Sequence, residues 1–347
     1  MSTKAISACK MCKKIAIFLF TGILMVSPVV LTAQSQPDPH FSQFYGNPLY
    51  LNPALAGSNI CPRLNFNYRN QWPSLSNSFV TYSASYDQYI NKISGGIGVN
   101  VLADRAGDGL LNTYMINLMY SFRLQVSNHV FMNMALEGSY AQMNLNWNEL
   151  EFGEQIDPQQ GYNPAIGIPE TPPDNNTISY PDFSAGIAIS YKGSLYGGIA
   201  VHHLTQPSNS FYSNAESKLE MKYTVHGGAM IDLAGNDPYD EEFGNFSISP
   251  NFMYMQQGAF HELNIGMYAT KYPFILGAWF RHNFENADAF IPMAGIEYRA
   301  FKFAYSYDIT LSKLKSVTGG AHEITVGWQF NCLEKRRRIR AINCPRF

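Results

Sequence analysis

The sequence predicts an all-β fold, a transmembrane antiparallel β-barrel of the outer membrane with about 14 strands. Three observations lead to this class. The chain opens with an export signal, no later segment reaches the ~18 apolar residues that a transmembrane helix needs, and period-two alternation dominates after residue 60. Only 14% of residues are charged, while the chain has 22 Tyr and 23 Phe. Low charge and many aromatic residues are typical of a barrel wall in lipid.

Residues 1–33 have the features of a signal peptide for Sec-type export. Four lysines precede an apolar segment from Ile15 to Val30, and Ala33 is a small residue at the expected cleavage point. Removal of this segment leaves 20 Lys and Arg against 26 Asp and Glu, a formal charge of −6. The mature charge gives no reason to expect nucleic acid as a partner.

Residues 34–60 form a proline-broken lead-in, which we expect to lie in the periplasm ahead of the barrel. Within it, Asp38–Gly57 contains three Asn-Pro or Asp-Pro steps, several aromatic residues and no Lys or Arg. Such a segment is neither a regular helix nor a regular strand, because each proline removes a backbone donor and restricts the residue before it.

Residues 61–331 carry the alternation of the barrel. In the segment after Phe79, Val80 and Tyr82 alternate with Thr81 and Ser83, and a barrel in lipid turns such an apolar face outward and the polar face inward. With both barrel ends of the chain in the periplasm, we expect short turns there and longer loops at the cell surface, apart from a long acidic periplasmic connection at 236–244. The expected strands are 62–72, 76–90, 93–104, 110–123, 129–145, 181–192, 194–205, 217–232, 243–256, 260–271, 273–284, 288–299, 300–309 and 319–331.

The longest connection, residues 146–181, has two possible interpretations, a surface loop or a plug folded into the barrel. Its prolines and acidic residues and its lack of apolar repeat favour the surface loop.

Three cysteines remain after processing: Cys61, Cys332 and Cys344. Closure of the barrel pairs the first and last strands, which brings Cys61 and Cys332 to the same rim. A disulfide between them would fix this seam, and Cys332 with Cys344 is equally accessible by loop length.

No catalytic set, cofactor or metal site is expected. The adjacent pair His202 and His203 should point to opposite faces of its strand, and no G-x-S-x-G motif is present. Asp104–Gly109 has two carboxylates in a hairpin loop but lacks EF-hand spacing. Beyond the barrel, residues 332–347 form a basic tail with Arg336, Arg337 and Arg338, which suits either a periplasmic acidic partner or plain solvation.

Motifs at both ends of the chain resemble the PorP/SprF family, outer-membrane proteins of the type IX secretion system of Bacteroidetes. The back of the chain matches in His322–Ile324 and in the ending Arg340–Phe347. The residues that carry the likeness at the front, and that the resemblance marks as family motif or partner contact, are Asp38, Pro39, Phe41, Ser42, Gln43, Asn47, Pro48, Leu49, Asn52, Pro53, Gly57, Arg69 and Trp72.

The resemblance implies a non-enzymatic barrel of the secretion and gliding motility machinery. Its implied partners are outer-membrane lipid, periplasmic ring and motor proteins, and a secreted adhesin with a type B C-terminal domain. It leads us to expect that Phe41–Gly57 docks to the periplasmic mouth of the barrel or to a secretion partner, and that the tail, including Cys344, supports a periplasmic contact. The alternative function is a passive diffusion porin, which requires an open lumen.

Overall fold

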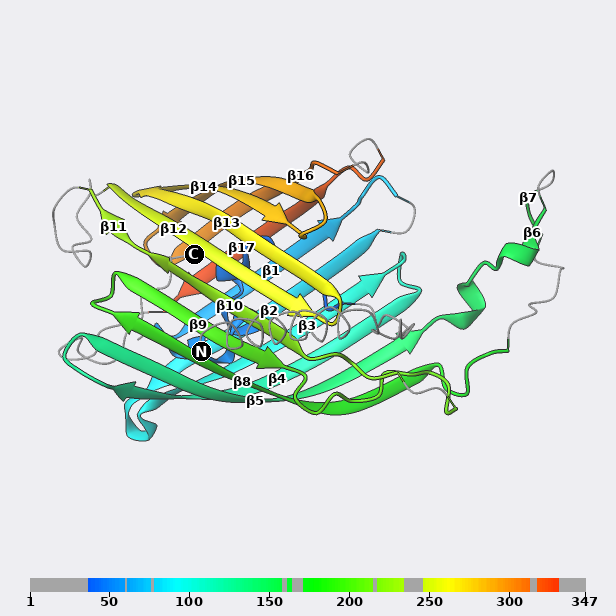
Figure 1. Ribbon diagram of the computed structural model, residues 1–347, viewed down its shortest axis with the longest axis horizontal. Helices are drawn as coiled ribbons and strands as arrows, with labels where there is room; N and C mark the ends of the chain where they lie inside the picture. Colours follow the sequence, from blue (N-terminus) through cyan, green and yellow to red (C-terminus); the bar gives the residue numbers. More distant parts are fainter. Residues whose placement is uncertain are drawn as a thin grey trace, which may run out of the picture. The chain divides into compact units, whose positions relative to one another are not determined.

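The computed structural model describes residues 37–59, 61–75, 78–157, 161–163, 171–214, 217–233, 246–312 and 317–330, all within one compact unit that spans Ser35–Phe347. One antiparallel sheet of 15 strands runs through this unit and closes on itself, because β10 pairs with β12 and β1 pairs with β17 (Figure 1). The strands are β1 (Arg63–Gln71), β2 (Phe79–Ile90), β3 (Gly95–Ala106), β4 (Leu111–Gln125), β5 (Val130–Leu145), β8 (Thr177–Tyr191), β9 (Leu195–His202), β10 (Lys222–Ala229), β11 (Ile231–Asp232), β12 (Phe246–Gln257), β13 (Phe260–Lys271), β14 (Phe274–His282), β15 (Ala287–Tyr298), β16 (Phe301–Thr310) and β17 (Ala321–Gln329).

Fourteen of these strands form the closed barrel, and β11 is a two-residue extension beside β12. Each expected segment contains one barrel strand, so the prediction of a barrel of about 14 strands is confirmed. The largest shift is at β10, which begins five residues later than expected. β8 begins four residues earlier than expected and runs through Pro181. Pro181 pairs only with Tyr140 of β5, because pairing of β8 with β9 starts at Ala185. A residue without a backbone N–H is tolerated at such an edge.

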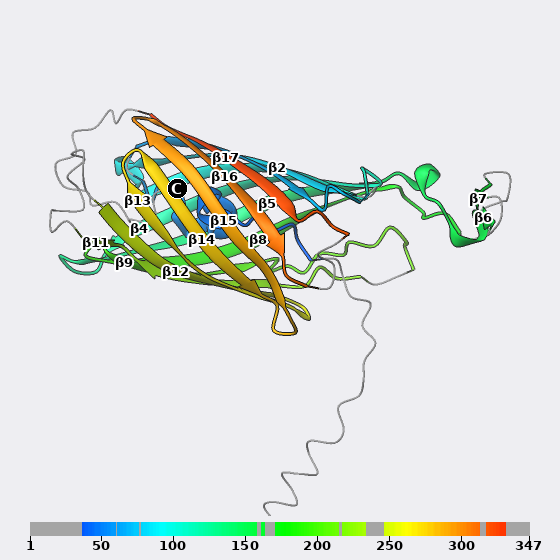
Figure 2. The same cartoon turned by 90° about the horizontal axis from the view of Figure 1, so that it is seen from above.

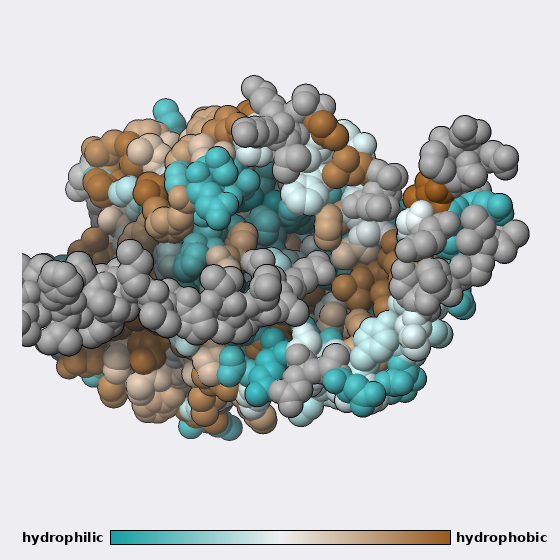
Figure 3. All heavy atoms as spheres, turned by 45° about the vertical axis from the view of Figure 1, so that its right-hand side comes forward, coloured by the Kyte–Doolittle hydropathy of each residue, from teal (hydrophilic) through white to brown (hydrophobic). Residues whose placement is uncertain are grey.

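The two faces of the barrel wall have opposite polarity, as predicted. On β2, Thr81, Ser83 and Ser85 face the interior and are buried, whereas Tyr82 is 47% exposed on the outside. Figure 3 shows the same division, with hydrophobic residues over the outer wall and hydrophilic residues in the hollow end of the barrel. An apolar exterior of this kind is suited to lipid.

The polarity inverts where β4, β5 and β8 extend past the exposed Tyr114 and Tyr140. Beyond Tyr140 on β5, outward positions such as Gln142, which is opposite Tyr114, are polar. On the inner face, Ala141, Met143, Ile178 and Tyr180 pack with Leu219 from the loop after β9. This wall therefore continues as a sheet of soluble type, which marks the tyrosines as the boundary of the lipid-facing band.

The lengths of the connections distinguish the two ends of the barrel. Short turns join β2 to β3, β4 to β5, β8 to β9, β13 to β14 and β15 to β16 at one end, which we call the short-turn end. The connections of residues 146–176, 203–221 and 311–320 all lie at the other end, the long-loop end. Bacterial outer-membrane barrels place short turns in the periplasm and long loops outside. The expected acidic connection at 236–244 lies outside the described residues.

In the part of the chain that the structure describes, the long connections do not fill the barrel. Described parts of the 146–176 loop form two small 3-10 turns, η4 (Trp147–Glu149) and η5 (Gly153–Gln155), and the short hairpin of β6 (Ile156–Asp157) and β7 (Gly161–Tyr162). Figure 1 shows this hairpin beyond the ends of the barrel strands. The interpretation as a surface loop, rather than a plug, agrees with this position.

The lumen contains the segment before β1 instead. Figures 1 and 2 show this segment, in blue, inside the ring of strands. Of residues 41–57, all except the partly buried Tyr50 are buried. This corrects the expectation that Phe41–Gly57 docks at the barrel mouth or to a partner. The polar inner wall supplies it with hydrogen-bond partners that water at the mouth would otherwise supply.

The barrel seam lies between β1 and β17, in register from Arg63 opposite Gln329 to Gln71 opposite Ala321. The Phe330 N–H donates to the Pro62 carbonyl and extends this pairing by one step. Cys61 is disulfide-bonded. Cys332, Cys344 and the tail arginines Arg336, Arg337 and Arg338 lie outside the described residues, so the partner of Cys61 stays a prediction.

We predict that Cys61 pairs with Cys332 across this seam, because the register places position 61 next to the end of β17. Non-reducing peptide mapping should recover a linked peptide of Cys61 and Cys332. Cys61→Ser should lower the unfolding free energy by about 2–4 kcal/mol, since the crosslink restricts the unfolded chain. A linked peptide of Cys61 and Cys344 would contradict the assignment.

Candidate functional site

The candidate site is the luminal plug, which we define as residues Asp38–Gly57. Its backbone forms three short turns, η1 (Phe44–Gly46), α2 (Pro48–Leu51) and η2 (Pro53–Leu55). Pro48 and Pro53 each occupy the first position of their turn, where the missing N–H costs nothing. The Asn-Pro steps therefore fold the segment into compact turns that fit within the lumen.

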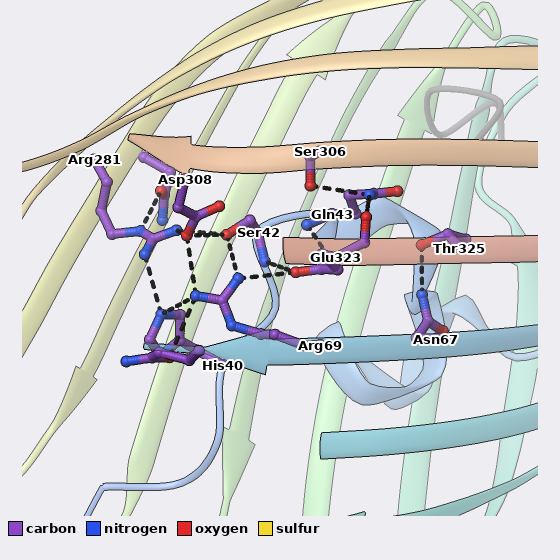
Figure 4. A network of polar contacts seen from close by, with 12 residues as sticks. His40, Ser42, Gln43, Asn67, Arg69, Arg281, Ser306, Asp308, Glu323 and Thr325 are labelled. Atoms are coloured by element: carbon purple, nitrogen blue, oxygen red, sulfur yellow. Dashed lines mark hydrogen bonds and ion pairs between the residues drawn. The ribbon is translucent and has the colours of Figure 1, made fainter. Parts of the chain in front are cut away.

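A carboxylate of β17 binds the plug backbone near its start. Glu323 is fully buried and accepts hydrogen bonds from two successive backbone groups, Ser42 N–H at 2.7 Å and Gln43 N–H at 2.9 Å. The Gln43 side chain donates to Ser306 Oγ and to the Glu323 carbonyl. These contacts fix both the height and the orientation of the plug against β16 and β17 (Figure 4).

Two arginines neutralise the carboxylates around this contact. Arg69 of β1 lies 3.0 Å from both Asp308 Oδ2 and Glu323 Oε2, and Arg281 of β14 lies 2.7 Å from Asp308 Oδ2. Ser42 Oγ accepts from both guanidinium groups and donates to Asp308 Oδ2. Because all four charged side chains are almost completely buried, this arginine network is stable only as a complete set.

His40 completes the arginine network as a hydrogen-bond acceptor. Its Nε2 lies 3.3 Å from Arg69 Nη2 and 3.1 Å from Arg281 Nη1. Burial and the two neighbouring guanidinium groups hold the pKa of His40 well below 6.5. The imidazole is therefore neutral at neutral pH, with Nε2 accepting and Nδ1 carrying the proton.

A second ionic cluster holds the first residue of the plug. Asp38 Oδ2 lies 2.8 Å from both His203 Nε2 and Lys222 Nζ, and His203 Nδ1 lies 2.7 Å from Asp182 Oδ2. Burial alone would raise the pKa of Asp38, but His203 and Lys222 more than offset it and hold that pKa well below 3.8. Gln257 accepts from the Asp38 N–H at 2.9 Å. We call this the Asp38 cluster.

His203 is charged in this cluster. Burial lowers its pKa, whereas Asp38 and Asp182 raise it, with a net result of about 9. Lys222 also covers the ring of Tyr50 at 4.4 Å. The cluster thus combines two cations with two carboxylates around the plug.

Amide side chains hold the middle of the plug. Asn47 donates to Ser83 Oγ at 3.0 Å. Asn52 accepts from the Ala54 N–H and lies 3.1 Å from His226 Nε2. A Cβ at Gly198 would lie 2.7 Å from the Asn52 amide nitrogen, so the absence of a side chain on β9 allows this close approach.

Aromatic and aliphatic side chains fill the remaining space. Phe44 packs edge-on against Trp279 with ring centroids 4.7 Å apart, and Tyr45 lies near the same indole. Leu49 is fully buried and packs with Met119. Full burial of each such side chain is worth about 1.5–3 kcal/mol, so the apolar part of the plug is a genuine core inside a barrel with polar walls.

The plug ends at Gly57 beside the start of β3. The Gly57 N–H donates to Asp87 Oδ2 at 2.9 Å, and its carbonyl accepts from Arg123 at 2.8 Å. Gly57 has φ +62°, and a Cβ there would lie 2.5 Å from the Gly96 Cα. Only glycine fits both the left-handed backbone and the close approach of the two chains.

The family-motif residues of the sequence prediction converge on this site with one exception. Pro39 accepts from the Tyr50 hydroxyl and Phe41 packs against the same ring at 5.4 Å. Arg69, the central cation of the network, lies on the barrel wall. Trp72 lies apart, where it packs on Phe79 just beyond β1.

Sequence reasoning missed the barrel side of the site. Arg281, Asp308 and Glu323 were not predicted as site residues, and the signal that could have found them is a charged residue at an inward position of a strand. The prediction that His202 and His203 face opposite sides is wrong, since both are buried in the lumen. β9 ends at His202, and His203 has φ +59°, which turns its ring inward.

The fold and the site define the class: an outer-membrane β-barrel whose lumen holds its own N-terminal segment. In the described ranges no helix is long and apolar enough to cross a membrane, and no group of three or more His, Cys, Asp or Glu side chains is suited to a metal. The model of the family "Type IX secretion system membrane protein PorP/SprF" matches residues 33–328. The chain belongs to this family, as its terminal motifs predicted, and its location is the outer membrane.

Solved structures resemble the chain only at a low level. The toluene transporter TbuX of Ralstonia pickettii has a TM-score of 0.48 at 11% identity, over 81% of this chain and 92% of that one. Omp33 of Acinetobacter baumannii has a TM-score of 0.43 at 9% identity, over 79% and 100%. A FadL homologue of Pseudomonas aeruginosa has 0.40 at 11%, over 81% and 93%. The curated proteins give no match.

We predict that Gly46→Cys combined with Thr325→Cys crosslinks the plug to β17. A Cβ at Gly46 would lie 3.4 Å from the Thr325 Cβ, close to the separation in a disulfide. The crosslinked peptide should form spontaneously in outer membranes and be recovered by non-reducing peptide mapping.

A matched control moves the second cysteine by one residue. Val326 is adjacent in β17 but points to the outer face, so Gly46→Cys with Val326→Cys should give no crosslink. Equal crosslinking in both pairs, or in neither, would contradict the position of the plug.

We predict that Arg69→Ala destabilises the folded barrel by about 3–5 kcal/mol, because the substitution leaves Asp308 and Glu323 buried with too little positive charge. Arg299→Ala is the control, since Arg299 is exposed in the turn between β15 and β16 and should change stability by at most about 0.5 kcal/mol. Heat-dependent gel mobility and urea unfolding in detergent measure both. A similar, small effect of the two substitutions would show that the network adds little.

Proposed function

We propose that this chain is a non-enzymatic barrel of the type IX secretion and gliding machinery that aids secretion or surface anchoring of an adhesin with a type B C-terminal domain. Family membership supports the link to the secretion system. The adhesin and the periplasmic ring and motor proteins are the partners that we propose for it.

The observation that carries this proposal is the filled lumen. A passive porin needs a continuous aqueous channel, whereas here the plug contacts β1, β9, β12, β14, β16 and β17 and buries its aromatic side chains among them. A barrel whose lumen is filled in this way would conduct little, which suits an anchor or an accessory better than a pore. The porin alternative is therefore disfavoured.

The test is purification of the protein from native outer membranes in mild detergent, with identification of bound proteins by mass spectrometry. We expect a large surface protein with a type IX C-terminal domain, or periplasmic ring components, to be enriched roughly tenfold over a purification of an unrelated outer-membrane barrel. The same sample in planar bilayers should give no steady conductance. A barrel without partners that shows steady open pores would overturn the proposal in favour of the porin.

A further inference from the structure

The plug runs through the lumen from the long-loop end of the barrel to the short-turn end. A lead-in confined to the periplasm would instead begin at the short-turn end. The Asp38 cluster consists of residues at the long-loop end: His203 follows the last residue of β9, Lys222 is the first of β10 and Gln257 is the last of β12. The start of the plug is therefore held where the surface loops begin.

Successive contacts then descend through the barrel. Ser42 contacts Glu323 and Asp308, which lie two residues from the long-loop ends of β17 and β16. Asn47 reaches Ser83 in the middle of β2, and the Ala54 carbonyl accepts from Asn133, four residues into β5.

The last contacts lie at the short-turn end. Gly57 binds Asp87, close to the end of β2, and Arg123, close to the end of β4. Gly96, the residue that Gly57 touches, is the second residue of β3. From Gly57 the chain continues to β1, which begins at the same rim.

We infer that the protein threads its own lumen and presents Pro37, the residue before the plug, on the cell-surface side of the outer membrane. The barrel orientation follows from its turns, because short turns face the periplasm and long loops face outward. Pro37 precedes the Asp38 cluster at the long-loop end and is only partly buried. This inference does not depend on the secretion role.

The threading separates the two ends of the plug across the membrane. A partner that recognises the amino-terminal end meets it outside the cell, beside the loop of residues 203–221. At the periplasmic end, Gly57 and Ser58 are buried against Arg123 and are therefore not exposed to a partner.

The test labels Pro37→Cys in whole cells with a membrane-impermeant maleimide. Ser213→Cys, in the exposed loop after β9, is the surface control, and Lys192→Cys, in the exposed turn between β8 and β9, is the periplasmic control. The unsubstituted protein gives the background from its native cysteines. We expect Pro37→Cys to be labelled in intact cells to at least roughly half the level of Ser213→Cys, while Lys192→Cys reacts only after permeabilisation.

Labelling of Pro37→Cys only after permeabilisation would overturn the inference. A second variant covers the case in which the thiol is shielded in both conditions. An epitope tag inserted between Gln36 and Pro37 should bind antibody on intact cells, and heat-dependent gel mobility verifies that the tagged barrel is folded. Antibody binding that requires permeabilisation of cells with a folded, tagged barrel would overturn the inference equally.

Discussion

The arginine network is the interaction on which the rest of the structure depends. Arg69, Asp308 and Glu323 come from β1, β16 and β17, the strands that meet at the seam, and Ser42 of the plug joins them. Each charge is buried, so each needs the others. Because Ser42 belongs to the plug, this network is complete only when the plug lies in the lumen.

This constraint explains why the described polar side chains of the inner wall are buried rather than hydrated. In a porin, water satisfies the inward side chains. Here the backbone of the plug takes that role: Glu323 receives two backbone N–H groups, and Asp87 and Arg123 bind the N–H and carbonyl of Gly57. Between these polar contacts, Phe44, Tyr45 and Leu49 add an apolar core. The inner wall is thus complementary to one particular peptide.

The sequence predicted the wall much better than its contents. Period-two alternation is local, and lipid on one side enforces it strictly, so every described barrel strand could be located to within five residues. The plug obeys no period. Its proline steps correctly indicated irregular backbone, but its position depends on contacts between residues more than 200 positions apart, such as Ser42 with Asp308. The family likeness marked Ser42 and Arg69 as motif residues without giving their partners. The prediction that His203 faces away from His202 was wrong for a local reason, because the positive φ of His203 ended the alternation of the strand.

The position of the plug also bears on the order of assembly. Its residues touch both seam strands, β1 through Arg69 and β17 through Glu323, and the seam is the last pairing that a closing sheet can make. A segment already bound to the growing wall would act as a template that brings the two edges into register. A segment that entered afterwards would have to pass, amino end first, through a ring already closed. If the plug binds before closure, a bulky domain ahead of Asp38 is carried outward as the sheet closes into a barrel. If the plug enters after closure, the same domain blocks maturation. The size of the domain that can be fused ahead of Asp38 without blocking maturation therefore shows whether the barrel closes before or after the plug binds.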